Sequence, residues 1–210
     1  MTDEPLWLVR YVTKSEIDIF VAQHMGERML SFQGGDLRIQ FRRFNGQREN
    51  MTLEITENEL ADARKNWGNA LVEISTAFET EGVNAARAVA SRALDTVYGF
   101  DLGQVLFKPT LASGKQTFRT TRNGALAYFI GHSDEYPGDK GFGIQGWRSV
   151  VSETAATFIE GDIAMWMGWV TCTDKDGAIT KVDKSWGYKK DANGLLRIIL
   201  HHSSFPYRPA

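Results

Sequence analysis

The chain has 210 residues, of which 42% are hydrophobic and 24% charged. These proportions are typical of a globular protein with a buried core, and they exclude intrinsic disorder. The net charge of −2 lacks the basic excess that a nucleic-acid-binding protein carries. The single cysteine, Cys172, excludes an internal disulfide and every metal site built from several cysteines.

From the first residues we expect neither a secretory signal nor a membrane helix. Asp3 and Glu4 stand near the start, and the apolar run at residues 6–9 is far shorter than the roughly 20 residues that a membrane helix needs. We therefore expect a cytoplasmic protein with no membrane partner.

Residues 1–55 differ from the rest of the chain and are expected to form an N-terminal extension of unknown role. Residues 6–12 favour a strand, and residues 15–30 favour a short helix that Gly34 and Gly35 would end. Apolar residues then alternate with polar ones over 37–42, as in a half-buried strand. The segment carries no motif with chemistry, so a small cap, an oligomer contact and a poorly ordered extension all stay open.

Helical signals dominate the first half of the remaining domain, residues 56–210. Thr56 and Glu59 fit a capping box, and apolar residues then recur at helical spacing up to Gly82. Hydroxyl residues and Asn123 are typical of the start of a later helix, which would end near Gly131. We predict helices over 56–82, 84–98 and 121–130, and a short strand over 105–107.

The chain after Gly141 is typical of strands. Turn signals such as Asp176-Gly177 and Asn193-Gly194 divide it into four long antiparallel strands. These strands are predicted over 147–159, 163–173, 179–189 and 195–203. Helices followed by a meander give an α+β fold. A twisted sheet that curls under three helices would form a cone, and its open mouth is the expected place for a small-molecule site.

Histidines are the residues that titrate near neutral pH, and two of the four are adjacent at 201 and 202. On a strand, His201 and Ser203 share one face. Such a polar pair inside an apolar cone must find partners, although the two residues could also simply finish the strand. No His-x-His, His-Glu-x-x-His or Cys-x-x-Cys motif is present. A zinc site would need His24 and His132 to converge with a carboxylate, so the sequence favours a metal-free protein.

Four segments together resemble one enzyme family. They are Phe107–Thr110, Thr121–Phe129, Asp139–Phe142 and Leu200–Tyr207, of which the last is the most specific. The chain from about residue 58 to residue 207 resembles the iota class of carbonic anhydrases. That class is similar in fold to the association domain of calmodulin-dependent kinase II and belongs to the cone-shaped NTF2-like group. The resemblance implies a lyase that reversibly hydrates carbon dioxide to bicarbonate.

The resemblance also implies a set of site residues. Carried over position by position, Thr110, Tyr128 and Ser203 match the hydroxyl residues that hold bicarbonate in a metal-free pocket, and His201 lies beside them on the same strand face. His201 would orient these groups or relay the proton. No cofactor is expected, and zinc or manganese stays an alternative because some members of the family have been regarded as metal-dependent. On sequence alone, Tyr128 is also typical of a core tyrosine and Thr110 of a turn residue.

Two functions of other classes stay open. An isomerase or polyketide cyclase of the same fold group would use Tyr128 as an oxyanion donor and a carboxylate base, for which Asp95 and Glu153 are candidates. A non-enzymatic association domain would instead bind through its sheet. Trp residues on exposed sheet faces predict self-association, and we expect a homodimer. The three tryptophans concerned are Trp166, Trp169 and Trp186.

Overall fold

The computed structural model describes residues 31–33, 36–38 and 54–209, and the chain divides into two compact units, Met1–Met51 and Thr52–Ala210. In the first unit β1 (Ser31–Gln33) pairs antiparallel with β2 (Asp36–Arg38). The strand predicted over 37–42 therefore begins inside β2, and the rest of it lies outside the described residues. The strand predicted over 6–12 and the helix over 15–30 also lie outside them.

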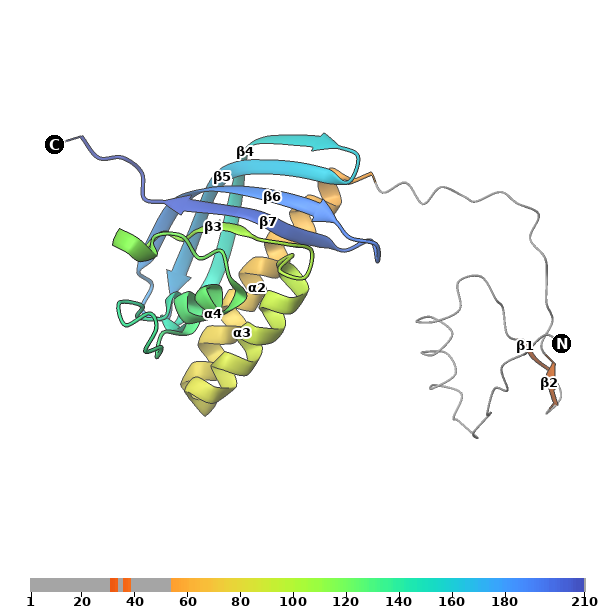
Figure 1. The fold of residues 1–210 in the computed structure, drawn as a ribbon, viewed down its shortest axis with the longest axis horizontal. Coiled ribbons are helices and arrows are strands. Elements are labelled where there is room, and N and C mark those ends of the chain that lie inside the picture. Colours follow the sequence, from red (N-terminus) through yellow and green to blue (C-terminus); the bar gives the residue numbers. More distant parts are fainter. Residues whose placement is uncertain (1–30, 34–35, 39–53, 210) are drawn as a thin grey trace, which may run out of the picture. The chain divides into compact units, whose positions relative to one another are not determined.

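Two long helices open the second unit, as predicted. In α2 (Glu57–Glu81) the backbone N–H of Glu59 donates to Thr56 Oγ1 at 3.2 Å, and the Thr56 N–H donates to the Glu59 carboxylate at 2.8 Å, which confirms the capping box. Gly82 ends α2 with a φ of 86°, a conformation that costs glycine little. The chain continues directly into α3 (Val83–Val97). Figure 1 shows α2 and α3 side by side on the same side of the sheet.

The sheet has five strands in the order β3-β7-β6-β5-β4. The predicted meander is confirmed as β4 (Trp147–Glu160), β5 (Ile163–Asp174), β6 (Ile179–Lys190) and β7 (Leu196–Ser204). The prediction of an antiparallel sheet is wrong in one respect. β3 (Leu106–Lys108) pairs parallel with β7, so the sheet is mixed. α4 (Arg122–Ile130) follows β3 in the chain and is capped by Thr121, whose hydroxyl accepts from the Gly124 N–H.

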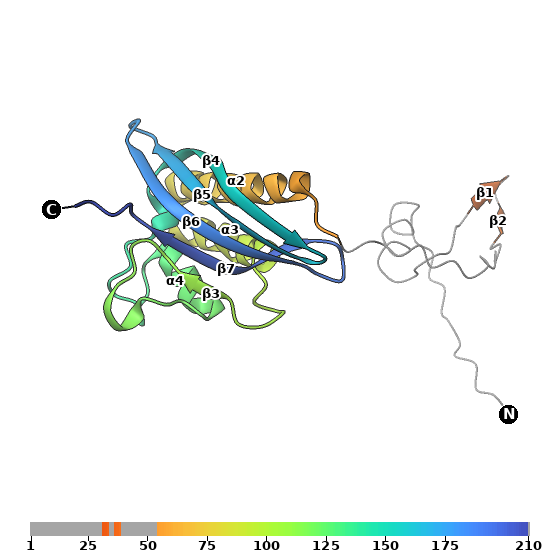
Figure 2. The ribbon, with the colours of Figure 1, turned by 90° about the horizontal axis from the view of Figure 1, so that it is seen from above.

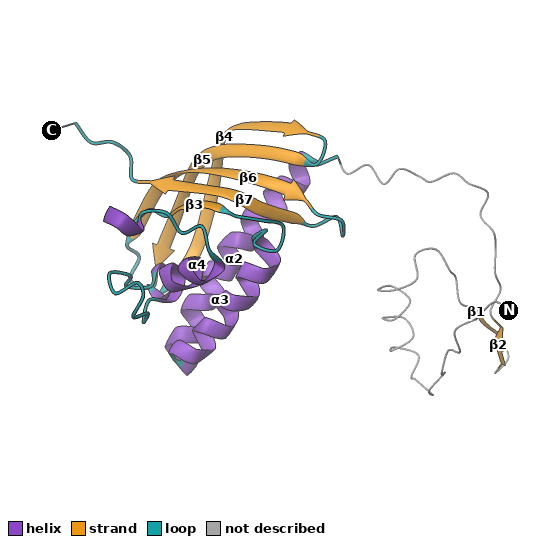
Figure 3. Cartoon of the chain, in the orientation of Figure 1, coloured by secondary structure: helices purple, strands orange, loops and turns teal. Residues whose placement is uncertain are grey.

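The helices cover one face of the sheet, as Figures 2 and 3 show from two directions. Side chains of β5 alternate between buried and more exposed, so that Trp166, Val170 and Cys172 point into the core. Leu60 and Leu71 from α2 are buried in the same core. Each large apolar side chain buried in this way stabilises the fold by about 1.5–3 kcal/mol.

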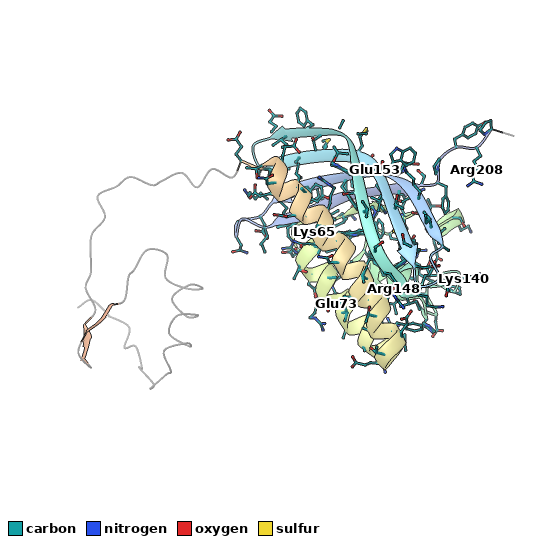
Figure 4. The ribbon with its side chains drawn as sticks, turned by 180° about the vertical axis from the view of Figure 1, so that it is seen from behind. Lys65, Glu73, Lys140, Arg148, Glu153 and Arg208 are labelled. Atoms are coloured by element: carbon teal, nitrogen blue, oxygen red, sulfur yellow. The ribbon has the colours of Figure 1, made fainter. Side chains whose placement is uncertain are left out.

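A close approach brings α2 against β4. A Cβ atom built on Gly68 would lie 2.9 Å from Val150 Cβ, which is nearer than two carbon atoms can pack, so glycine is required at this contact. The outward side of α2 carries charged side chains such as Lys65 and Glu73 (Figure 4). Within the described residues, no helix has the length and apolar character needed to cross a membrane.

Candidate functional site

The parallel pairing of β3 with β7 brings two hydroxyl side chains together. Phe107 is opposite His201 in the ladder and Lys108 is opposite His202, so the chain leaves β3 beside the end of β7. As a result Thr110 Oγ1 lies 2.6 Å from Ser203 Oγ. Ser203 is fully buried, and Thr110 is half-buried.

Tyr128 supplies a third hydroxyl from α4. Its side chain is buried, and the Leu111 N–H donates to its oxygen at 3.4 Å. Burial raises the pKa of Tyr128, and hydrogen bonding to Leu111 and Thr110 offsets only part of this effect. The hydroxyl therefore keeps its proton at neutral pH. Because its oxygen accepts from Leu111, its hydrogen is left to donate elsewhere.

His201 lies behind the hydroxyl pair, on the same face of β7 as Ser203. Its ring stacks on Phe107 at 4.6 Å between centroids. Nδ1 lies 2.9 Å from the Tyr98 hydroxyl, and Nε2 lies 2.9 Å from Lys184 Nζ. Burial, with smaller contributions from the charges of Lys184 and His202, holds the pKa of His201 well below its usual range. The imidazole is therefore neutral and accepts a proton poorly, which favours orientation over general-base catalysis as its role.

Lys184 is a residue of the site that the sequence analysis missed. It is paired with Ser203 across β6 and β7, and its Nζ lies 3.2 Å from Ser203 Oγ. The side chain is only 4% exposed, in the same inward phase of β6 as Val182, Trp186 and Tyr188. The sequence contains a signal for this placement: every second residue from Val182 to Tyr188 is apolar except Lys184, so the lysine is expected on the buried face of the strand. A second lysine, Lys108, donates to the Ser203 carbonyl oxygen at 2.7 Å.

Further hydrogen bonds hold Tyr98, whose hydroxyl contacts His201, in place. Trp67 Nε1 donates to the Tyr98 hydroxyl at 2.9 Å. The Tyr98 carbonyl oxygen in turn accepts from the Arg197 guanidinium at 2.7 Å. The buried Arg197 also pairs with Asp191 and Asp101. Tyr98 is thus held at both its hydroxyl and its backbone.

The carboxylates considered for an isomerase or cyclase lie away from this cluster. Asp95 is exposed and pairs with Arg122 at 2.6 Å. Glu153 is exposed on β4, where it pairs with Lys181 at 3.5 Å (Figure 4). Neither is placed to act as a base beside Tyr128.

Other residues considered from the sequence have ordinary surroundings. Cys172 is fully buried, and burial raises the pKa of its thiol to about 11, as expected of a small core residue. His132 is exposed in the loop after α4, and His24 lies outside the described residues. Within the described part of the chain, no three His, Cys, Asp or Glu side chains cluster so that they could hold a metal ion.

Comparisons with known proteins show the family of the chain. The family model described as metal-independent carbonic anhydrase matches residues 58–205. A metal-independent carbonic anhydrase from Nostoc sp. (strain PCC 7120) is 54% identical over 153 residues, which cover 73% of this chain and 75% of the relative.

One solved structure gives the same result. The crystal structure of an iota-carbonic anhydrase from a cyanobacterium, complexed with bicarbonate, is 50% identical with a TM-score of 0.76, over 78% of this chain and 99% of that one. A putative calcium/calmodulin dependent protein kinase II association domain from Xanthomonas campestris is 20% identical with a TM-score of 0.48, over 72% of this chain and 89% of that one. The resemblance found in the sequence motifs is confirmed, and the chain belongs to the metal-independent carbonic anhydrase family.

Proposed function

We propose that this carbonic anhydrase interconverts carbon dioxide and bicarbonate at the hydroxyl cluster of Thr110, Tyr128 and Ser203. The observation that carries the assignment is the 2.6 Å contact of a hydroxyl just after β3 with a hydroxyl on β7, beside a buried, protonated tyrosine. A relative of 50% identity has been crystallised with bicarbonate, which supports the choice of ligand. Residues 56–210 would be the catalytic domain, a cone formed by the sheet and the helices α2, α3 and α4.

The chemistry requires water to attack a neutral gas and leave an anion. Negative charge gathers on the oxygen atoms of the forming bicarbonate, where fixed hydrogen-bond donors stabilise it. The hydroxyls of Ser203, Thr110 and Tyr128 are hydrogen-bonded in a row, and the hydrogen left over at its end would donate to the ligand. His201 would hold the arrangement in place rather than accept the proton.

Substitution of single hydroxyls tests the assignment. In the full-length chain, Tyr128→Phe and Ser203→Ala should each lower kcat/KM for carbon dioxide hydration by about 10²–10³, the effect of losing one donor to a developing oxyanion. Stopped-flow measurement of the pH change gives the rate. Tyr207→Phe is the matched control, because Tyr207 is 87% exposed. Wild-type rates in both site variants would remove these residues from the site.

Chelation tests the metal-free reaction. The activity should survive exhaustive treatment with EDTA, as the family implies. Loss of activity on chelation, followed by recovery on addition of zinc or manganese, would contradict it.

We also propose a cytoplasmic homodimer. The tryptophan argument from the sequence is wrong for Trp166 and Trp186, which are buried in the core, and Trp169 is half-buried. Support comes instead from other apolar side chains that are exposed on β4, β5 and β6, since large apolar patches favour association. They are Val151, Phe158, Met165, Met167 and Ile179. Analytical ultracentrifugation of the wild type and of Met165→Lys should show a dimer that the substitution weakens, and a monomeric wild type would refute it.

A further inference from the structure

Lys184 is an unusual residue for the interior of this domain. Its Nζ is enclosed by the rings of Trp67 at 4.8 Å and Trp186 at 5.6 Å. Among the described residues, no carboxylate forms an ion pair with it. Its two hydrogen-bond contacts are His201 Nε2 and Ser203 Oγ. An ammonium ion in these surroundings would be poorly solvated, whereas a free amine is far less costly to bury.

The direction of the hydrogen bonds shows which form of Lys184 fits. The indole N–H of Trp67 can only donate, so the Tyr98 oxygen accepts from it. The hydrogen of the Tyr98 hydroxyl is then directed at His201 Nδ1, which accepts. A neutral imidazole that accepts at Nδ1 carries its hydrogen on Nε2, and this N–H faces Lys184 Nζ at 2.9 Å. Only a free amine has the lone pair to receive it.

The opposite arrangement leaves a buried group without a partner. If Lys184 were an ammonium ion, it would donate to His201 Nε2, and the imidazole hydrogen would move to Nδ1. The Tyr98 oxygen would then accept from both Trp67 and His201, and its own hydrogen would have no acceptor among the contacts described. A buried donor without an acceptor is costly, so the network favours the amine.

The titratable groups that shift the pKa of Lys184 lie on two further strands, β3 and β5, and on its own strand, β6. Cys172 on β5 and Asp183 on β6 favour the ammonium form, while Lys108 on β3 opposes it. α2 contributes only the ring of Trp67 and the end of α3 only the hydroxyl of Tyr98. Burial outweighs the charges and lowers the pKa of Lys184 to about 7. The free amine and the ammonium ion are therefore both accessible near neutral pH.

We propose that Lys184 takes up the proton released when water adds to carbon dioxide, acting through the hydroxyl of Ser203. The inference rests on the proposed function. As the water oxygen bonds to carbon, one C=O electron pair moves onto a carbonyl oxygen. The Ser203 hydrogen turns from Thr110 Oγ1 to Lys184 Nζ, so that Ser203 passes its own proton to Lys184 as it accepts one from the water. Rotation about the Cε–Nζ bond turns the lone pair from His201 to Ser203 without moving a heavy atom. Bicarbonate and the ammonium ion are the products, and the proton later leaves to buffer.

This role matches the charge on the protein to the charge on the ligand. The amine is neutral when carbon dioxide is bound, and it becomes positive as the anion forms. Because hydration needs the amine, its rate should increase as pH rises through about 7. Because bicarbonate binds better to the ammonium form, its binding should be coupled to the uptake of a proton.

The pH profile separates this role from simple packing. In the full-length wild type, kcat/KM for hydration should rise to a plateau with an apparent pKa near 7. Lys184→Met keeps the length and packing of the side chain. Its plateau rate should be lower by about 10²–10⁴, which is typical of the loss of a general base, and the increase in rate with pH (the pH limb) should disappear. Lys181→Met, on the outward face of the same strand, should keep both. A Lys184→Met variant with a normal melting temperature and an unchanged pH limb would overturn the proposal.

A binding measurement on the wild type needs no variant. Titration of the protein with bicarbonate at pH 7.5, in buffers of different ionisation enthalpy, reports the number of protons taken up per ligand. We expect uptake of a substantial fraction of one proton. Bicarbonate binding and carbon dioxide hydration without proton uptake would refute the role of Lys184 and leave the proposed function intact. Absence of both binding and hydration would instead refute the proposed function.

Discussion

Two buried tyrosines differ in the surroundings of their hydroxyls, and this difference makes a sharp prediction about stability. Tyr98 and Tyr188 are 2% and 0% exposed. The Tyr98 hydroxyl lies 2.9 Å from both Trp67 Nε1 and His201 Nδ1. The Tyr188 hydroxyl is buried without a hydrogen-bond partner among the described protein atoms. The same substitution, Tyr to Phe, should therefore have opposite effects at the two positions.

The magnitudes follow from the groups left behind. Tyr98→Phe leaves the Trp67 N–H and His201 Nδ1 unpaired in the core. At about 1–3 kcal/mol for each buried polar group, the free energy of unfolding should fall by roughly 2–6 kcal/mol. Tyr188→Phe removes one buried group that makes no such bond, so the free energy of unfolding should stay the same or rise by about 1–3 kcal/mol.

Urea unfolding of the two full-length variants, followed by circular dichroism, measures both changes. Melting temperatures give a second reading, because 1 kcal/mol corresponds to about 2–4 °C for a domain of this size. The ring packing of the two tyrosines is retained in phenylalanine, so the comparison isolates the hydroxyls. Equal shifts in the two variants would show that the bonds to Tyr98 contribute no net stability, and the directional argument for Lys184 would lose its first step.

Three further outcomes are expected in the same unfolding assay. Gly168→Ala should destabilise the fold by about 1–3 kcal/mol, because the added Cβ on β5 would overlap the carbonyl oxygen of Glu153 on the neighbouring strand β4. An unchanged free energy of unfolding would contradict this close contact. Arg197→Met should cost about 3–5 kcal/mol, because the buried Asp191 carboxylate loses its cationic partner and the Tyr98 carbonyl loses its donor. A smaller loss would mean that Arg197 is dispensable. Burial alone would raise the pKa of Asp191, but hydrogen bonds from two backbone amides and Arg197 lower it overall. The contribution of the Asp191 carboxylate to the free energy of unfolding should therefore be present above about pH 4, near the unfolded pKa of about 3.9, and be lost as pH falls further. In Asp191→Asn the free energy of unfolding should depend less on pH in this range.

Local signals explain why so much of the fold could be predicted. The capping box of Thr56 and Glu59 and the glycine at 82 act within one turn of helix, so they mark both ends of α2 from the sequence alone. The four long strands begin and end within about two residues of the predicted bounds, because Asp-Gly and Asn-Gly steps favour tight reversals wherever they occur.

Long-range contacts explain what was missed. β3 has only three residues, and its partner β7 lies more than ninety positions later, so no local pattern indicates that the two strands pair in parallel. The contact of Thr110 with Ser203 depends on this pairing. Lys184 was missed because a charged residue in a strand is usually solvated, and Trp166 and Trp186 were assigned to exposed faces because the phase of the alternation was not followed along β5 and β6.

The polarity of the hydrogen-bond network connects the core to the ligand. Trp67 can only donate, so with Lys184 as the amine the bonds run from Trp67 through Tyr98, His201, Lys184 and Ser203 to Thr110, each group accepting from the one before it. Thr110 and Tyr128, whose hydroxyls also hydrogen-bond each other, stand at the end of this chain, and the Tyr128 oxygen accepts from the Leu111 N–H. A hydroxyl hydrogen at the end of the chain favours the oxygen of an anion. The proposed binding of bicarbonate through hydroxyls thus requires interior donors aligned in one direction, and the first of them, the indole N–H of Trp67 on α2, sets that direction.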